Sequence, residues 1–136
     1  MTADVFLDTN VLVYSYDDRE PNKRRIARSH IAQSDFCVST QVLGELFVTL
    51  TRKIPNTVPA EAAAQAIEDL RAQSVVPLSD VLVSAAIETS IRYQLSYWDA
   101  LIVEAAAAAG CTTLLTEDLN DGTVIKGVHI VNPFGA

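Results

Sequence analysis

Short apolar runs alternate with longer helical patterns along the chain, and this alternation restricts the fold more than any other feature. The runs read as strands; they cover residues 4–8, 35–39, 75–76, 112–116 and 128–131. Apolar residues at helical spacing fill the segments between them; these segments are 11–16, 21–33, 40–52, 59–73, 79–93 and 97–109. Strands joined by helices form a parallel sheet whose two faces are both covered. The sequence therefore predicts the α/β class.

Length and composition describe one globular unit. A chain of 136 residues fits a single domain, which we expect to span residues 1–136. Hydrophobic residues make up 49% and charged residues 20%, which excludes a disordered chain. No apolar stretch approaches the ~20 residues of a membrane span, so we expect no membrane association. Cys37 and Cys111 are too few for a disulfide framework and indicate buried thiols in a reducing compartment, the cytoplasm.

Charge is unevenly distributed. The net charge is −7, which argues against binding to nucleic acid by charge alone. Seven of the ten basic residues nevertheless fall within residues 19–53, while the rest of the chain is strongly acidic. Such a basic segment can contact a polyanion locally, especially where bound cations offset the acidic remainder.

Several carboxylates occur at strand ends and in helices, at positions that core packing does not explain. Asp8 ends the first strand, Asp118 follows the fourth strand by two residues, and Asp121 lies three further on. The carboxyl ends of parallel strands share one edge of the sheet, where ligands bind. Asp99 begins an otherwise almost wholly apolar helix, and Glu45 lies within the helix 40–52.

Each of these acids also has an ordinary structural interpretation. Asp8 can join a turn, and Asn10 can cap the helix 11–16. Asp99 follows Ser96 by three residues, which is the spacing of a capping box. The other three acids can be solvated residues of a helix or a turn.

Taken together, the acids favour a metal site. Converging carboxylates without a cation repel one another, and a hard divalent cation removes the conflict. Oxygen ligands favour Mg²⁺ or Mn²⁺, whereas zinc favours His or Cys, and neither His30 nor His129 lies in a Cys/His cluster. The chain also lacks the glycine-rich phosphate loops and the G-x-S-x-G nucleophile motif.

Four motifs, in order along the whole chain, resemble the PIN-domain ribonucleases and in particular the VapC-like toxins of bacterial toxin–antitoxin modules. They are D-T-N-V-L (8–12), Gly44-Glu45-Leu46, Y-W-D-A-L-I (97–102) and T-E-D-L-N-D-G (116–122). The resemblance implies a three-layer α/β/α sandwich with a parallel sheet of about five strands in the order 3-2-1-4-5. It implies a Mg²⁺- or Mn²⁺-dependent endoribonuclease, commonly a homodimer, with a cognate antitoxin that blocks the acidic pocket.

The resemblance also assigns roles to individual residues. The catalytic and metal-binding set is Asp8, Glu45, Asp99 and Asp118. Asp121 matches an additional metal-binding acid, Thr116 matches a hydroxyl that supports the first aspartate, and Asn10 lies beside the ligands. Within the basic segment, the candidates for RNA backbone contacts are Arg24, Arg25, Arg28, Arg52 and Lys53. The competing interpretation of these five is a solvated helix face.

Two other functions fit the same residues. The main alternative is a non-catalytic acidic α/β module that binds a divalent cation or a basic partner peptide. A phosphoacceptor receiver-like domain is less favoured, because it needs a lysine after the fifth strand, whereas Lys126 precedes that strand.

Overall fold

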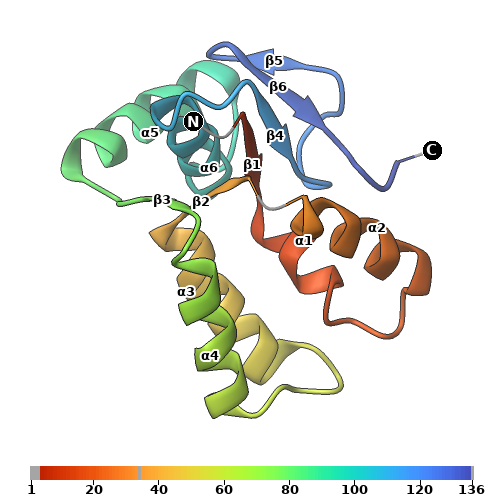
Figure 1. The fold of residues 1–136 in the computed structure, drawn as a ribbon. Coiled ribbons are helices and arrows are strands. Elements are labelled where there is room, and N and C mark those ends of the chain that lie inside the picture. Colours follow the sequence, from red (N-terminus) through yellow and green to blue (C-terminus); the bar gives the residue numbers. More distant parts are fainter. Residues whose placement is uncertain (1–3, 34, 136) are drawn as a thin grey trace.

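The computed structural model describes residues 4–33 and 35–135 and confirms the α/β fold (Figure 1). The strands are β1 Val5–Leu7, β2 Cys37–Ser39, β3 Ser74–Val76, β4 Thr113–Leu115, β5 Val124–Ile125 and β6 Val128–Val131. The helices are α1 Thr9–Tyr14, α2 Pro21–Ala32, α3 Thr40–Val48, the π-helix η1 Thr49–Lys53, α4 Ala60–Leu70, α5 Asp80–Tyr93 and α6 Tyr97–Ala108. No helix in this part of the chain is long and apolar enough to cross a bilayer.

The sheet has the order β3-β2-β1-β4-β6-β5, with β1 in its interior. Phe6 of β1 pairs in parallel with Cys37 of β2 on one side and with Leu114 of β4 on the other. The expected order 3-2-1-4-5 is confirmed, because the fifth expected strand, 128–131, pairs in parallel with β4 as β6. The carboxyl ends of β1 and β4 are therefore neighbours.

The short strand β5 was not expected. It pairs antiparallel with β6 at the edge of the sheet, with Ile125 opposite Val128. The two residues between them, Lys126 and Gly127, have φ angles of 55° and 78°. A tight two-residue hairpin of the I′ kind needs positive φ at both central positions, which explains why this edge turns back on itself.

The first helix begins earlier than the sequence suggested. Asp8, not Asn10, caps α1: its side chain accepts a 2.7 Å hydrogen bond from the backbone N–H of Thr9. Asn10 instead lies in the first turn, so the expectation that it caps the helix was wrong. At α6 the expected cap is present, since the Ser96 hydroxyl accepts from the backbone N–H of Asp99 at 3.0 Å.

The helix expected over 40–52 is two elements. Its regular part ends at Val48, and the chain continues as the π-helix η1, where the N–H of Ile54 donates to the carbonyl of Thr49 at 3.2 Å. One extra residue per turn is typical of such segments, which often occur at functional sites. Leu50 is fully buried within η1, which anchors this wider turn to the core.

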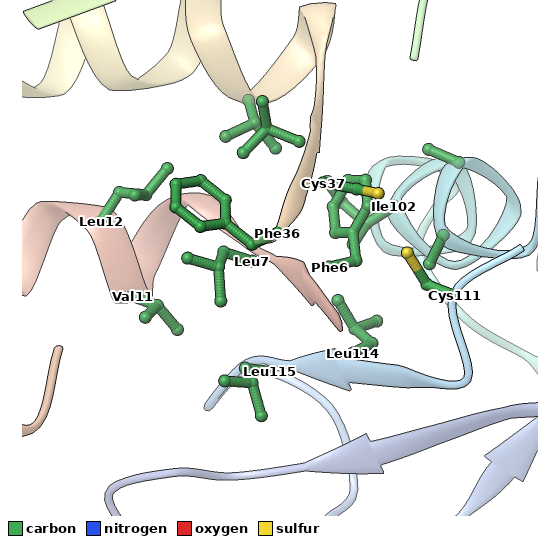
Figure 2. Close-up of a cluster of buried hydrophobic side chains, with 14 of the residues drawn as sticks. Phe6, Leu7, Val11, Leu12, Phe36, Cys37, Ile102, Cys111, Leu114 and Leu115 are labelled. Atoms are coloured by element: carbon green, nitrogen blue, oxygen red, sulfur yellow. The ribbon is translucent and has the colours of Figure 1, made fainter. Parts of the chain in front are cut away.

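The core lies on both faces of β1, as Figure 2 shows. Alternate strand residues point to opposite faces. Phe6 lies with Ile102 of α6 and the two buried cysteine side chains, whereas Leu7 lies toward α1. In α6 every residue from 100 to 106 is buried, which accounts for its long apolar run. This packing fixes the end of β1, and with it Asp8, in a rigid frame.

Candidate active site

Asp8 and Asp118, the acids that follow β1 and β4, meet at the shared carboxyl edge of the sheet. The side-chain amide of Asn10 lies between them, with Nδ2 3.4 Å from Oδ2 of Asp8 and 3.0 Å from Oδ2 of Asp118. Asp8 is buried, whereas Asp118 is exposed. The pair thus has one member fixed in the protein and one that faces solvent.

Thr116 holds this pair together. It is fully buried, and its hydroxyl donates to Oδ2 of Asp8 at 2.8 Å. The hydroxyl oxygen of Thr116 also accepts two hydrogen bonds, from the backbone N–H of Asp118 and from Nδ2 of Asn10, both at 3.1 Å. A hydroxyl has one donor and two acceptor sites, so all three are in use. Thr116 therefore fixes both carboxylates relative to β4.

The amide of Asn10 is surrounded by more acceptors than it can serve. Its NH₂ group carries two hydrogens but faces three oxygens, from Asp8, Thr116 and Asp118. The backbone N–H of Glu117 donates to the amide oxygen of Asn10 at 3.3 Å, which supports this orientation of the amide. The centre of the site is consequently rich in acceptors and short of positive charge.

Glu45 and Asp99 complete the acidic site from two other helices. Oε1 of Glu45, on α3, accepts a 3.1 Å hydrogen bond from the hydroxyl of Thr9 at the start of α1. Asp99 lies half-buried in the first turn of α6. Each of the four acids therefore comes from a different part of the fold.

Electrostatics shows that these acids act on one another. Burial raises the pKa of Asp8 to about 6, although the hydrogen bonds from Thr116 and Thr9 oppose the rise, and the charges of Asp118 and Glu45 raise it further. Burial also raises the pKa of Asp99; its hydrogen bond with Ser96 opposes the rise and the charge of Asp118 adds to it. Asp8 forms no ion pair with any residue in 4–33 or 35–135.

The donor chemistry of this site fits a hard divalent cation. Every acidic ligand is an oxygen, the centre lacks positive charge, and both properties suit Mg²⁺ or Mn²⁺. Within the described segments, no three His, Cys, Asp or Glu side chains are already arranged as a metal-ligand group. The amide of Asn10 contacts both Asp8 and Asp118.

Asp121 is not joined to this network. Its side chain is exposed and accepts a 2.8 Å hydrogen bond from the backbone N–H of Asn132, just after β6. This contact ties the turn 117–123 to the end of the sheet. Among the described contacts, Asp121 has none with Asp8 or Asp118.

The basic candidates divide into two groups. Arg24, Arg25 and Arg28 lie on α2 and line a cavity of about 420 Å³, and Nε of Arg28 donates to the carbonyl of Ser15 at 3.0 Å. Arg52 and Lys53 lie on η1 and are exposed; of these two, only Lys53 lines a cavity shared with Thr9 and Asn10. The basic segment is therefore not one continuous surface.

Sequence reasoning missed a second polar network beside the site. Oε1 of Glu117 accepts from the Tyr14 hydroxyl at 2.5 Å, and Oε2 lies 3.0 Å from the ammonium of Lys23. That ammonium also lies 4.7 Å from the centre of the Tyr14 ring. Lys23 and Glu117 are 94 residues apart, so no local pattern signals their pairing. Thr9 was missed as well, because its contact with Glu45 depends on the packing of α3 beside α1.

The fold and the site define a class: a parallel α/β sandwich with a carboxylate site at the carboxyl edge of its central strands. The family model of the PIN domain matches residues 5–120, so the chain belongs to the PIN domain family. A comparison with curated proteins finds no significant match.

Solved structures share the fold. A chain of a toxin–antitoxin complex from Klebsiella pneumoniae is 19% identical with a TM-score of 0.72, and the match covers 97% of this chain and 99% of that one. VapC20 of Mycobacterium tuberculosis, described as a toxin that cleaves the sarcin–ricin loop, is 21% identical with a TM-score of 0.60 over 81% of this chain and 86% of its own. VapBC2 of Rickettsia felis, bound to a promoter DNA fragment, matches at 21% identity and a TM-score of 0.60, over 93% and 96% of the two chains.

Proposed function

We propose that this protein is a metal-dependent endoribonuclease that hydrolyses RNA phosphodiesters and serves as the toxin of a toxin–antitoxin pair. The observation that carries the proposal is the buried Asp8, which shares its site with three other acids and has no cationic partner within the described residues. Membership of the PIN domain family supports a nuclease, and the similar toxin structures support the toxin role.

The residues that would hold Mg²⁺ or Mn²⁺ are Asp8, Asp99 and Asp118, with Glu45 binding directly or through water. When bound, such a cation supplies an activated water and offsets the charge that develops on the phosphate. Thr116 and the backbone N–H of Thr9 hold the Asp8 carboxylate in place. We expect products with a 5′-phosphate and a 3′-hydroxyl, because no described contact within residues 4–33 and 35–135 brings a pair of His or Lys side chains to the four acids for acid–base chemistry.

The proposal extends to partners and location. The similar structures include toxin–antitoxin complexes, which supports a protein antitoxin that covers the acidic site. Exposed apolar side chains on α5, among them Val81, Ile87 and Ile91, offer surface for a homodimer or for the antitoxin. The two buried cysteine side chains are in keeping with a reducing cytoplasm.

The decisive experiment compares wild type with Asp99→Asn. Both are incubated with end-labelled structured RNAs in Mg²⁺, in Mn²⁺ and in EDTA, and the product ends are identified. Asp35→Asn is the control, because Asp35 is exposed and lies outside the acidic site. We expect cleavage by wild type and by the control only with a divalent cation, leaving 5′-phosphates.

Other outcomes point elsewhere. Products with a 2′,3′-cyclic phosphate would overturn the metal route. Equal cleavage by wild type and Asp99→Asn would indicate a contaminant or a different site. Thermal stabilisation by Mg²⁺ with no cleavage of any RNA would favour a non-catalytic module that binds a cation or a basic peptide.

A further inference from the structure

A cavity of about 500 Å³ adjoins the acidic site. It is lined by α1, the following segment up to Glu20, η1 with Ile54, and Glu117 after β4; we call it the α1–η1 cavity. Thr9 and Asn10 line this cavity and also bond to the site carboxylates, Thr9 to Glu45 and Asn10 to Asp118. A molecule in the cavity therefore lies directly beside the acids.

The lining has the character of a small-molecule site. Val13 and Ile54 supply apolar surface, whereas Asn10 and the hydroxyl of Thr49 supply hydrogen-bonding groups. Ligand sites in proteins commonly have volumes of about 300–1,000 Å³. This cavity is within that range and has a largely polar lining, which suits a polar ligand. The volume suits one nucleotide unit.

Most charged groups around the cavity already have partners. Arg19 is bonded to Asp17 through two nitrogens, at 3.0 and 2.7 Å. Glu117 is held by Tyr14 and Lys23, as described above. Two charged lining groups remain without an ion pair among the described residues: Lys53 on η1 and Glu20 at the start of α2.

These two charges are of the kinds that bind the phosphate and the base or ribose of a nucleotide. An ammonium binds phosphate as a point charge, and a carboxylate accepts hydrogen bonds from base amino groups or ribose hydroxyls. We propose that the α1–η1 cavity is a nucleotide subsite, which holds the ribonucleotide next to the scissile phosphodiester with its far phosphate on Lys53. The inference rests on the proposed nuclease function, and it names the group that positions the substrate beside the acids.

The first test uses the four nucleoside 5′-monophosphates, titrated in Mg²⁺ into ¹⁵N-labelled protein and followed by amide chemical shifts. We expect shifts concentrated in residues 13–20 and 49–54, and at least fivefold weaker binding by Lys53→Glu. Arg92→Glu is the control, because it makes the same charge change on α5, away from the cavity. Equal weakening by both variants would show that Lys53 acts only through the overall charge of the protein. It would overturn the assignment of Lys53 as the phosphate-binding group.

A second pair of variants separates shape from charge. Thr49→Trp fills the cavity with no change in charge, and Thr49→Val keeps its size. We expect at least fivefold weaker binding of the monophosphates for Thr49→Trp and less than twofold for Thr49→Val. Unchanged binding by Thr49→Trp would show that the nucleotide does not enter the cavity.

Cleavage assays on the wild type keep the two proposals distinct. If wild type cleaves RNA but the monophosphates shift only amides elsewhere, such as those of the α2 arginine cavity, the subsite is wrong and the nuclease stands. If wild type cleaves no RNA but the monophosphates shift residues 13–20 and 49–54, the nuclease is wrong and the cavity is a nucleotide site.

Discussion

Two buried carboxylates, Asp8 and Glu104, differ in whether a cation lies beside them. Each is 6% exposed. Glu104 accepts a 2.6 Å hydrogen bond from Thr89 and lies 3.3 Å from the ammonium of Lys126. Asp8 receives hydrogen bonds but no cation, and its charged neighbours are themselves acids. Among the described residues, the fold thus gives Glu104 a counter-charge and gives Asp8 none.

The same contrast recurs between adjacent residues. Glu117 is bonded to Tyr14 and Lys23. Among the described residues, the hydrogen bonds of Asp118 are to Asn10 and, through its backbone, to Thr116. These two neighbouring acids on one turn therefore make different kinds of contact. Glu117 links the turn to α1 and α2, and Asp118 faces the site.

The largest expected effect is on cleavage, and it separates these neighbours. Asp118→Asn should lower the cleavage rate by at least about 100-fold, because it removes a charge from the proposed metal site. Glu117→Gln should keep the cleavage rate within a few-fold of wild type, because the side chain of Glu117, among the described residues, contacts Lys23 and Tyr14 and not the other acids. Single-turnover cleavage at saturating Mg²⁺ measures both. Similar losses for the two variants would show that the turn acts as one unit.

The second effect is on stability and has an unusual sign. The pKa of Asp8 rises from 3.8 to about 6 on folding, so the folded chain binds more protons than the unfolded chain between these values. Stability contributed by protonated Asp8 is therefore present at pH 4 and lost as the pH rises through 6. Asp8→Asn, which keeps a helix-capping residue, should raise the free energy of unfolding by about 2 kcal/mol at pH 7.5 and hardly at all at pH 4.

Urea unfolding of Asp8→Asn and Asp35→Asn at the two pH values tests this expectation. Asp35 is exposed, so its variant should match the wild type at both. Mg²⁺ should stabilise the wild type at pH 7.5 more than it stabilises Asp8→Asn. Destabilisation of Asp8→Asn at pH 7.5 would mean that hydrogen bonds to the carboxylate outweigh its burial.

The smallest expected effect is on stability and concerns Glu104, the buried acid that has an ion pair. Lys126→Met leaves Glu104 buried without its cation and should lower the free energy of unfolding by about 1 kcal/mol, because Lys126 is partly exposed and its pairing is screened. Lys53→Met is the control, since Lys53 is exposed and forms no ion pair with a described residue. Equal unfolding midpoints for the two variants would contradict the comparison between Glu104 and Asp8.

The strand pattern was enough to predict the sheet and the edge where the site lies. The order 3-2-1-4-5 was implied by the family resemblance and the capping of α6 by Ser96 follows from local spacing; both are confirmed. The same local rules were wrong at Asn10, because Asp8 is the better-placed cap and tertiary contacts draw the Asn10 amide toward Asp118.

Other features have no local signal. The π-helix η1 depends on how Leu50 packs into the core, which periodicity does not encode. The ion pairs Lys23–Glu117 and Lys126–Glu104 join segments far apart in the chain. A residue such as Glu104 therefore reads as an interruption of an apolar helix until its partner is seen.

Pairing of β1 with β4 has a consequence for synthesis of the chain. Asp8 and Thr116 are 108 residues apart, and each directly follows one of two strands that pair with one another, β1 and β4. A nascent chain that has emerged only as far as α5 holds Asp8 and Glu45 but neither Asp99 nor Asp118. At about 5–20 residues per second, the chain spends on the order of ten seconds on the ribosome before its acids can assemble. Products that end before α6 therefore carry only two of the four acids.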